Sequence, residues 1–243
     1  MIITGDSIKE ISKINGEVQT WICDPPYNIN YNYGDSFKDK FSDRDYQKFI
    51  KRLSLEMRRK SKDNSSFFLI HYPEIAARLI PYIESTGWEL HQWISWVYPS
   101  NFGMSKRKFT RGHRAILWFK TDVGEPKFKH TIKGKYRDPN DKRVKKRIES
   151  GNKPALLDWL EINLVKKGSK EHVGYFNQIP KKLLEILILN TTEEGDLVGD
   201  PCAGSGSTVK TAIVNKRKGW GCDINPESRK LFKGWFYSRL EAF

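Results

Sequence analysis

The sequence predicts an α/β protein built on a doubly wound, mostly parallel sheet. Short apolar and β-branched runs alternate along the chain with segments in which apolar residues recur every three to four positions. Such alternation is typical of parallel strands joined by helices that cover both faces of one sheet. The length of 243 residues suits one large core, or one core with an inserted lobe. The aromatic content of 13% excludes a disordered chain.

Seven strands are expected from the apolar runs. They are Met1–Thr4, Val18–Cys23, Ser66–His71, Leu90–Val97, Ala115–Phe119, Asp196–Val198 and Gly219–Cys222. Four helices are expected from the helical spacing of apolar residues between the strands. They are Asp45–Arg59, Pro73–Glu84, Pro180–Leu189 and Ser207–Asn215. The alternation stops between Thr121 and Lys170, so this segment is expected to be an insertion or separate lobe rather than core. His71 is expected to be a core histidine with satisfied hydrogen bonds.

Composition also narrows the class of protein. The mean hydropathy of −0.64 leaves no apolar run of about 20 residues, which excludes a transmembrane helix. The N-terminal sequence lacks the basic and then apolar pattern of a signal peptide. The three cysteines lie at neither disulfide-framework nor zinc-site spacing, and the five histidines do not cluster. We therefore expect a cytoplasmic protein with no metal site and no membrane partner.

The formal charge of +14 is concentrated in the middle of the chain. Residues Asn101–Lys170 contain 20 Lys and Arg against 7 Asp and Glu, a net of +13, so the other 173 residues carry +1. The densest run is Tyr136–Arg147, where Pro139 and two aspartates argue against a simple amphipathic helix. Concentrated positive charge favours a surface that binds nucleic-acid phosphates, although an acidic partner or a solubility patch would show the same composition. The candidate DNA contacts are Lys106, Arg107, Lys142, Arg143, Lys145, Lys146 and Arg147.

A four-residue motif follows the expected strand Val18–Cys23 at its carboxyl end, where parallel sheets bind ligands. The motif consists of Asp24, Pro25, Pro26 and Tyr27. Asp24 offers a hydrogen-bond acceptor, and the prolines, which lack amide hydrogens, leave carbonyl groups free to accept. Tyr27 offers a flat face on which a planar base can stack. Two acceptors beside an aromatic platform fit an exocyclic amine, whereas an ordinary turn would explain only the two prolines.

A glycine-rich turn, residues 200–208 with the sequence DPCAGSGST, follows another expected strand and precedes a helix. Glycines at such a turn let a ligand approach the backbone and the helix N-terminus. No lysine follows the glycines, and Val209 replaces the third glycine of a dinucleotide fingerprint, so neither of those phosphate-binding loops is matched. Asp223 lies 23 residues after Asp200, at a distance where an acidic residue binds ribose hydroxyls. The combination predicts a cofactor that contains a nucleoside.

Together the two motifs resemble those of the amino-methyltransferases that use S-adenosylmethionine to methylate exocyclic amines of DNA bases. The resemblance covers nearly the whole chain outside residues 121–152. The order of catalytic motif, basic segment and cofactor motif is similar to that of the β class, a circular permutation with the target-recognition region in the middle. The family's fold is a seven-stranded sheet with one antiparallel strand. The resemblance implies a catalytic half at residues 1–120, a basic target-recognition insertion at 121–165 and a cofactor-binding half at 166–243.

The resemblance also implies roles for single residues. The catalytic residues would be Asp24, Pro25, Pro26 and Tyr27. Asp6 would contact the cofactor adenine, and Asn177 would lie near its methionine part. The other cofactor-binding residues would be Asp200, Cys202, Gly204, Ser205, Gly206, Thr208 and Asp223. Three positions depart from the family pattern: an aromatic residue is usual at Cys202, a lysine at Ile179 and a glutamate at Arg114.

These features predict methyl transfer to the exocyclic amine of a base flipped out of double-stranded DNA. Adenine N6 is favoured over cytosine N4, because a serine in place of Asp24 is more usual in cytosine enzymes. An RNA or protein-amide methyltransferase is the alternative enzyme, although its cofactor motif usually comes first. A DNA-binding protein with a degenerate methyltransferase fold is the non-enzymatic alternative, which the intact motifs disfavour. A cognate restriction endonuclease and a homodimer are further partners that the family implies.

Overall fold

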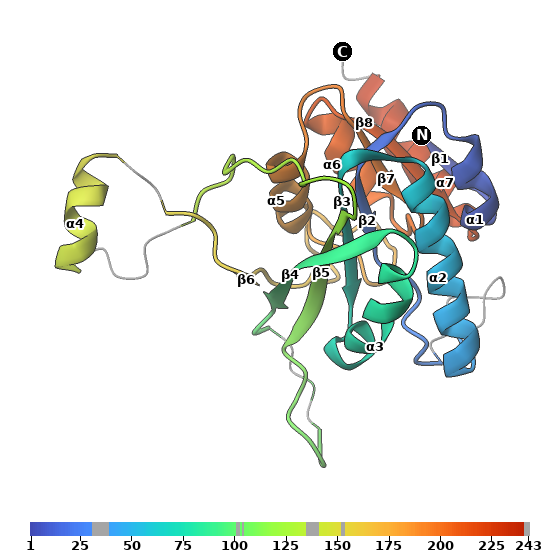
Figure 1. Ribbon diagram of the computed structural model, residues 1–243, viewed down its shortest axis with the longest axis horizontal. Helices are drawn as coiled ribbons and strands as arrows, with labels where there is room; N and C mark the ends of the chain where they lie inside the picture. Colours follow the sequence, from blue (N-terminus) through green and yellow to red (C-terminus); the bar gives the residue numbers. More distant parts are fainter. Residues whose placement is uncertain (31–38, 101–102, 104, 135–140, 152–153, 241–243) are drawn as a thin grey trace.

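A computed structural model describes residues 1–30, 39–100, 103, 105–134, 141–151 and 154–240. One eight-stranded sheet runs through the molecule, with helices on both faces (Figure 1). Its order is β1-β8-β7-β2-β3-β5-β4-β6. The strands are β1 (Ile2–Thr4), β2 (Val18–Cys23), β3 (Ser61–His71), β4 (Trp88–Val97), β5 (His113–Thr121), β6 (Trp159–Glu161), β7 (Leu197–Asp200) and β8 (Lys218–Asp223). Strand β5 runs antiparallel to β3 and β4, and the other neighbours are parallel, which confirms the predicted fold class.

Two of the described helices begin at a residue whose side chain caps the first turn. In α2 the Ser42 hydroxyl accepts the amide hydrogen of Asp45 at 3.1 Å, and arginines occupy the last turn, where they complement the helix dipole. The helical elements are α1 (Ser7–Glu10), a 3-10 turn (Ile11–Lys13), α2 (Asp43–Arg59), α3 (Pro73–Glu84), α4 (Lys142–Glu149), α5 (Lys181–Thr191), α6 (Ser207–Val214) and α7 (Pro226–Leu240). All four predicted helices are present. Within the described part of the chain, no helix combines the length and apolarity needed to cross a membrane.

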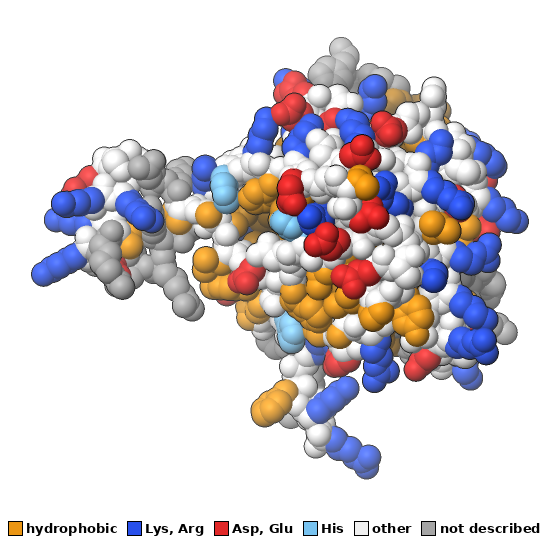
Figure 2. Space-filling view, in the orientation of Figure 1, with side chains coloured by type: hydrophobic (Ala, Val, Ile, Leu, Met, Phe, Trp, Pro, Cys, Tyr) orange, Lys and Arg blue, Asp and Glu red, His pale blue; other side chains and the backbone are white. Residues whose placement is uncertain are grey.

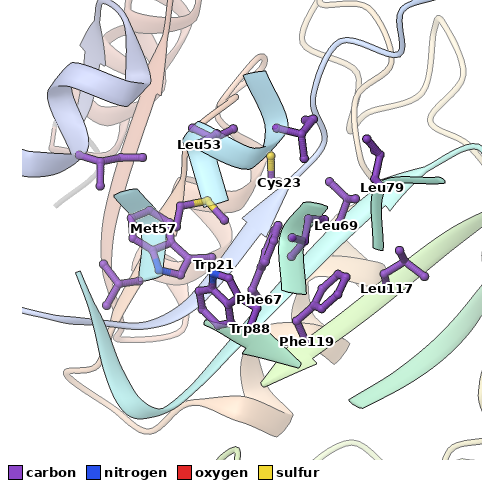
Figure 3. Close-up of a cluster of buried hydrophobic side chains, with 14 of the residues drawn as sticks. Trp21, Cys23, Leu53, Met57, Phe67, Leu69, Leu79, Trp88, Leu117 and Phe119 are labelled. Atoms are coloured by element: carbon purple, nitrogen blue, oxygen red, sulfur yellow. The ribbon is translucent and has the colours of Figure 1, made fainter. Parts of the chain in front are cut away.

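The core consists of two main layers, one on each face of the sheet. Alternate residues of β2 face opposite layers, since Trp21 and Cys23 pack on the side of α2 and α3 and Ile22 packs on the side of α5. Figure 3 shows the first layer, where side chains of α2 and α3 meet those of β2, β3 and β5. Helix α7 packs separately against β1, next to α6. Because helices cover both faces of the sheet, a binding site has room only at the ends of the strands.

The pairing of β2 with β7 depends on a close contact between Trp21 and Gly199. The two residues are partners in the parallel register. A Cβ atom at position 199 would lie 2.4 Å from the Trp21 ring, so glycine is required there. The Trp21 indole donates a hydrogen bond to the Ser61 hydroxyl at 2.9 Å, which fixes the ring. This contact places the ends of β2 and β7, and hence Asp24 and Asp200, at one edge of the sheet.

Part of the expectation for the middle segment is wrong. Residues Trp159–Glu161 form an eighth strand that pairs with β4, and Leu160 and Ile162 are buried in the second core layer. The Trp96 indole also donates to the Ile162 carbonyl at 2.7 Å. The predicted insertion 121–165 therefore does not lie wholly outside the core. A three-residue edge strand carries too little periodicity to be recognised from sequence.

For residues 142–147, the expectation that the basic run would not form a simple helix is also wrong. Residues Lys142–Glu149 form α4, which stands apart from the body of the molecule (Figure 1). The carbonyl of Asp141 accepts the amide hydrogens of Val144 and Lys145, so the helix begins after the residues that disfavour it. Pro139, on which the expectation rested, belongs to residues 135–140, which lie outside the described residues.

Gly199→Ala is expected to destabilise the fold by about 1–3 kcal/mol, because the added methyl group would overlap the Trp21 ring. Urea denaturation of the purified variant measures the free energy of unfolding. Gly112→Ala is the matched control, since nothing lies within 4 Å of its added Cβ. An unchanged stability in Gly199→Ala would contradict the tight β2–β7 contact.

Candidate active site

A cavity of about 330 Å³ lies at the carboxyl ends of β1, β2, β7 and β8. Twelve of the thirteen predicted catalytic and cofactor-binding residues line it. They are Asp6, Asp24, Pro25, Pro26, Tyr27, Asn177, Asp200, Cys202, Gly204, Ser205, Thr208 and Asp223. The thirteenth, Gly206, precedes α6 with a φ of 74°, and an added Cβ would lie 2.7 Å from Ile2. Gly206 therefore shapes the turn and does not line the cavity. The Asp24–Tyr27 motif and the glycine-rich turn share this one cavity.

Asp223 ties the glycine-rich turn to the end of β8. One carboxylate oxygen accepts the Gly204 amide hydrogen at 2.7 Å, and the other accepts that of Asn225 at 2.8 Å. Burial raises the pKa of Asp223, and these two amides oppose the shift. Each carboxylate oxygen retains a second lone pair, which a ribose hydroxyl could use. The residue thus shapes the turn and offers acceptors to a nucleoside.

Asp200 is buried beneath the same turn. Its carboxylate accepts the amide hydrogen of Cys202 at 3.0 Å. Burial raises the pKa of Asp200 to about 7, against the hydrogen bonds from Thr208 and the Cys202 amide, and the Asp24 charge adds to the rise. The cavity is therefore lined by two carboxyl groups, Asp24 and Asp200, and the negative charge of one disfavours ionisation of the other.

Asp24 and Tyr27 form a hydrogen-bonded pair within the first motif. The Tyr27 hydroxyl donates to an Asp24 carboxylate oxygen at 2.5 Å. Burial raises the pKa of Asp24 to about 6, while the Arg114 guanidinium and the Tyr27 hydroxyl oppose the rise. The Tyr27 ring stacks on His71 with centroids 4.4 Å apart, so His71 covers one face of the ring. Tyr27 lines the cavity with a side chain that is 4% exposed.

His71 and Tyr46 fix the backbone of the motif. His71 accepts the Tyr72 amide hydrogen at Nδ1 (2.8 Å), so the network assigns its proton to Nε2, which donates to the Tyr46 hydroxyl at 2.8 Å. Tyr46 in turn donates to the Pro26 carbonyl at 2.7 Å. Burial lowers the pKa of His71 to about 3, so the ring is neutral. The expectation that His71 is a satisfied core histidine is confirmed.

The role of Tyr46 was missed by the sequence reasoning. Tyr46 lies on α2, 20 residues after the carbonyl that it contacts, and is buried. Within the sequence its position is that of an ordinary apolar-face residue of the helix. Among the described residues, nothing donates to the neighbouring Pro25 carbonyl, and Pro25 lines the cavity. That carbonyl and the Asp24 carboxylate are the acceptors that the motif offers to a substrate.

Comparison with known proteins identifies the family. The sequence pattern of the N6/N4 DNA methylase family matches residues 18–234, which is most of the chain. The chain belongs to this family. It is thus a DNA amino-methyltransferase that uses S-adenosylmethionine, as the sequence predicts.

Named relatives of this methylase include type II methyltransferases and a DNA adenine methyltransferase. Type II methyltransferase M.HpaI of Haemophilus parainfluenzae is 26% identical over all of this chain and 76% of its own length. DNA adenine methyltransferase YhdJ of Escherichia coli K12 is 26% identical over 95% of this chain and 80% of its own. The solved structure of the cytosine-N4-specific PvuII DNA methyltransferase has a TM-score of 0.71 at 18% identity, covering 93% of this chain and 82% of that one. At this identity the structural likeness concerns the fold.

The candidate DNA contacts of the methylase lie outside the cavity, on two projections from its body. Lys106 and Arg107 are exposed in the loop between β4 and β5. Exposed basic side chains on α4 come from Lys142, Lys145, Lys146 and Arg147, and the side chain of Arg143 lies outside the described residues. Figure 2 shows Lys and Arg gathered on both projections. The structure therefore separates the candidate DNA-binding residues from the residues that would hold the cofactor.

Tyr46→Phe is expected to destabilise the methylase by about 1–3 kcal/mol, because buried polar groups lose their partner. Methyl transfer should also slow, since the Pro26 carbonyl loses the bond that fixes the motif, while S-adenosylmethionine affinity is retained. Urea denaturation, turnover and calorimetry measure the three effects. Tyr82→Phe, at a partly exposed tyrosine on α3, is the control. Unchanged stability and turnover in Tyr46→Phe would contradict this role.

Proposed function

We propose that this methylase transfers the methyl group of S-adenosylmethionine to the N6 amine of an adenine flipped out of double-stranded DNA. The observation that carries the proposal is the shared cavity, which the Asp24–Tyr27 motif and the glycine-rich turn both line. The cofactor, when bound, supplies an electrophilic methyl group on a sulfonium. The protein's own residues then have to bind, orient and activate the amine.

Activation is needed because the lone pair of the amine is delocalised into the base. The Asp24 carboxylate and the Pro25 carbonyl would accept the two amine hydrogens, which favours the sp³-like geometry in which the lone pair can attack in line. The bond from nitrogen to the methyl carbon forms as the bond from sulfur to that carbon breaks. Asp24, with a pKa raised to about 6, is suited to take the proton that the methylated amine releases. Apart from this proton transfer, the contribution of the protein is one of positioning and electrostatics, with no covalent intermediate.

Access to the amine requires base flipping, which costs a few kcal/mol of lost stacking and pairing. Tyr27 lines the cavity, and stacking of the flipped base on its ring would recover part of this cost. On the cofactor side, Asp223 would bind the ribose hydroxyls, Asp6 the adenine and Asn177 the methionine part. The proposed halves of the chain, 1–120 and 166–243, thus supply the amine-binding and most of the cofactor-binding residues.

Two observations support adenine as the target. The motif begins with aspartate, whereas serine is more usual in cytosine-N4 enzymes, and the relative YhdJ is named a DNA adenine methyltransferase. The likeness to the cytosine-N4-specific PvuII enzyme concerns the fold only. A cognate restriction endonuclease and a homodimer stay predictions of the family resemblance.

Asp24→Ala is expected to abolish methyl transfer to DNA and to leave S-adenosylmethionine binding intact, because Asp24 holds the amine. Asp223→Ala is expected to weaken cofactor binding, because the glycine-rich turn loses its tie and the ribose loses an acceptor. Transfer of a labelled methyl group and calorimetry of cofactor binding measure the two effects. Retained turnover in Asp24→Ala, or an unchanged cofactor Kd in Asp223→Ala, would contradict the assigned roles.

Reversing three charges on α4, as Lys145→Glu, Lys146→Glu and Arg147→Glu together, is expected to weaken DNA binding and to leave cofactor binding unchanged. The slope of log K against log salt should fall by about 1 for each DNA phosphate that the variant no longer neutralises. Equilibrium DNA binding at several salt concentrations measures both. The control reverses exposed charges of α7, Arg229, Lys230 and Lys233. Equal weakening in the two triple variants would show a general charge effect and refute the role of α4.

A further inference from the structure

A buried cation lies next to the amine-binding motif, at a position where the family commonly has a glutamate. Arg114 is 5% exposed and stands near the beginning of β5, opposite Trp96 of β4. Because β5 is antiparallel and Ala115 pairs with His71 at the end of β3, Arg114 reaches the edge of the sheet where the cavity lies. Because β5 runs in the opposite direction, its first residues lie beside the carboxyl ends of the parallel strands, and Arg114 is one of them.

Three aromatic rings surround the Arg114 guanidinium. Its central carbon lies 5.1 Å from the ring centroid of Tyr27, 5.2 Å from that of Trp96 and 5.9 Å from that of Tyr98. Its buried Nε has no hydrogen-bond partner among the described residues, and Asp24, the carboxyl group that acts on it, does so through its charge and not through a hydrogen bond. A buried cation of this kind requires an anion nearby.

The acid whose charge acts on Arg114 is Asp24, and Tyr27 contacts both residues. The Tyr27 ring contacts the guanidinium, and its hydroxyl donates to the Asp24 carboxylate, so the tyrosine bridges the two charges. Arg114 itself is not among the described residues that line the cavity, whereas Asp24 and Tyr27 are. Arg114 therefore acts on the substrate through Asp24 and does not touch it.

We infer that Arg114 is a positioning residue that holds the Asp24 carboxylate in its charged, hydrogen-bond-accepting form. The inference rests on the proposed function, because it assigns Arg114 a task only where Asp24 binds the amine. If Asp24 were protonated, one of its oxygens would carry a hydrogen and face the amine as a donor. The side chain could then no longer accept hydrogen bonds from the amine and from the Tyr27 hydroxyl through two charged oxygens. A buried carboxyl group needs such a partner to remain charged at neutral pH.

None of the other described titratable groups around Asp24 supplies the positive charge that would keep its carboxylate ionised. The titratable side chains that act on it or feel its charge are Cys23 on β2, Tyr27 on its own loop, Tyr46 on α2, Arg114 on β5 and Asp200 on β7. Asp200 is a second acid, and the tyrosines and the cysteine are neutral because their pKa values are raised by burial. Among these described groups, Arg114 alone is positively charged.

The pH dependence of methyl transfer tests the inference. Below its folded pKa Asp24 is protonated, so the single-turnover rate of the parent should fall as the pH falls through about 6. Arg114→Met and Arg114→Gln remove the positive charge, so this acid limb of the pH–rate profile should shift to higher pH by about one unit or more. At pH 6.5 the neutral variants should then be at least about threefold slower, and near pH 8.5 they should approach the parent rate.

Arg114→Lys should restore the parent limb, because it keeps the charge. Arg58→Met is the matched control, since Arg58 is a largely buried arginine that pairs with Asp122 away from the site, and its removal should leave the limb in place. An acid limb at the parent pH in both neutral variants, or an equal loss of rate at every pH, would overturn the inference, as would loss of folding in both. Absence of amine methylation by the parent, or retained turnover in Asp24→Ala, would instead overturn the proposed function.

Discussion

The contact between Trp21 and Gly199 is the constraint on which the site depends. It lets β2 and β7 pair in parallel although Trp21 is a large ring, and the absence of a Cβ at position 199 is what makes room. The parallel register then brings Asp24 and Asp200 to the same edge, 176 residues apart in sequence. The Asp-Pro-Pro-Tyr motif and the glycine-rich turn thus become two walls of one cavity, in which we propose that the amine and the cofactor meet. Methyl transfer needs this closeness, because the methyl carbon and the amine nitrogen must meet in line.

Electrostatics decides what the cavity can do once it is formed. Burial raises the pKa of both Asp24 and Asp200, to about 6 and about 7, so the fold brings together two acids that resist ionisation. The neutral His71 and Tyr46 hold the motif in place by hydrogen bonds and add no charge. Arg114, from the one antiparallel strand, brings a positive charge to this edge. Nine of the 20 basic residues of segment 101–170 lie on α4 or in the β4–β5 loop, and none of the described residues among these nine lines the cavity.

The sequence predicts those parts of the molecule that are encoded locally. Strands β2 and β3 have strong apolar runs, and the Asp-Pro-Pro-Tyr motif and the glycine-rich turn are contiguous, so their residues could be named in advance. Strand β6 is too short to show a period, and α4 was hidden by the proline and aspartates before it. The contributions of Tyr46 and Arg114 arise from long-range packing. No pattern around either residue shows that it will lie against a motif from a different strand.

The most direct test of the account is the position of the transferred methyl group. The purified chain is incubated with double-stranded DNA and S-adenosylmethionine that carries a deuterated methyl group, and the DNA is digested to nucleosides for mass spectrometry. The account predicts the label on the N6 nitrogen of adenine, with none when Asp24→Ala is used. A label on the N4 nitrogen of cytosine would contradict the choice of base, and a label on a ring carbon would contradict amine chemistry at Asp24.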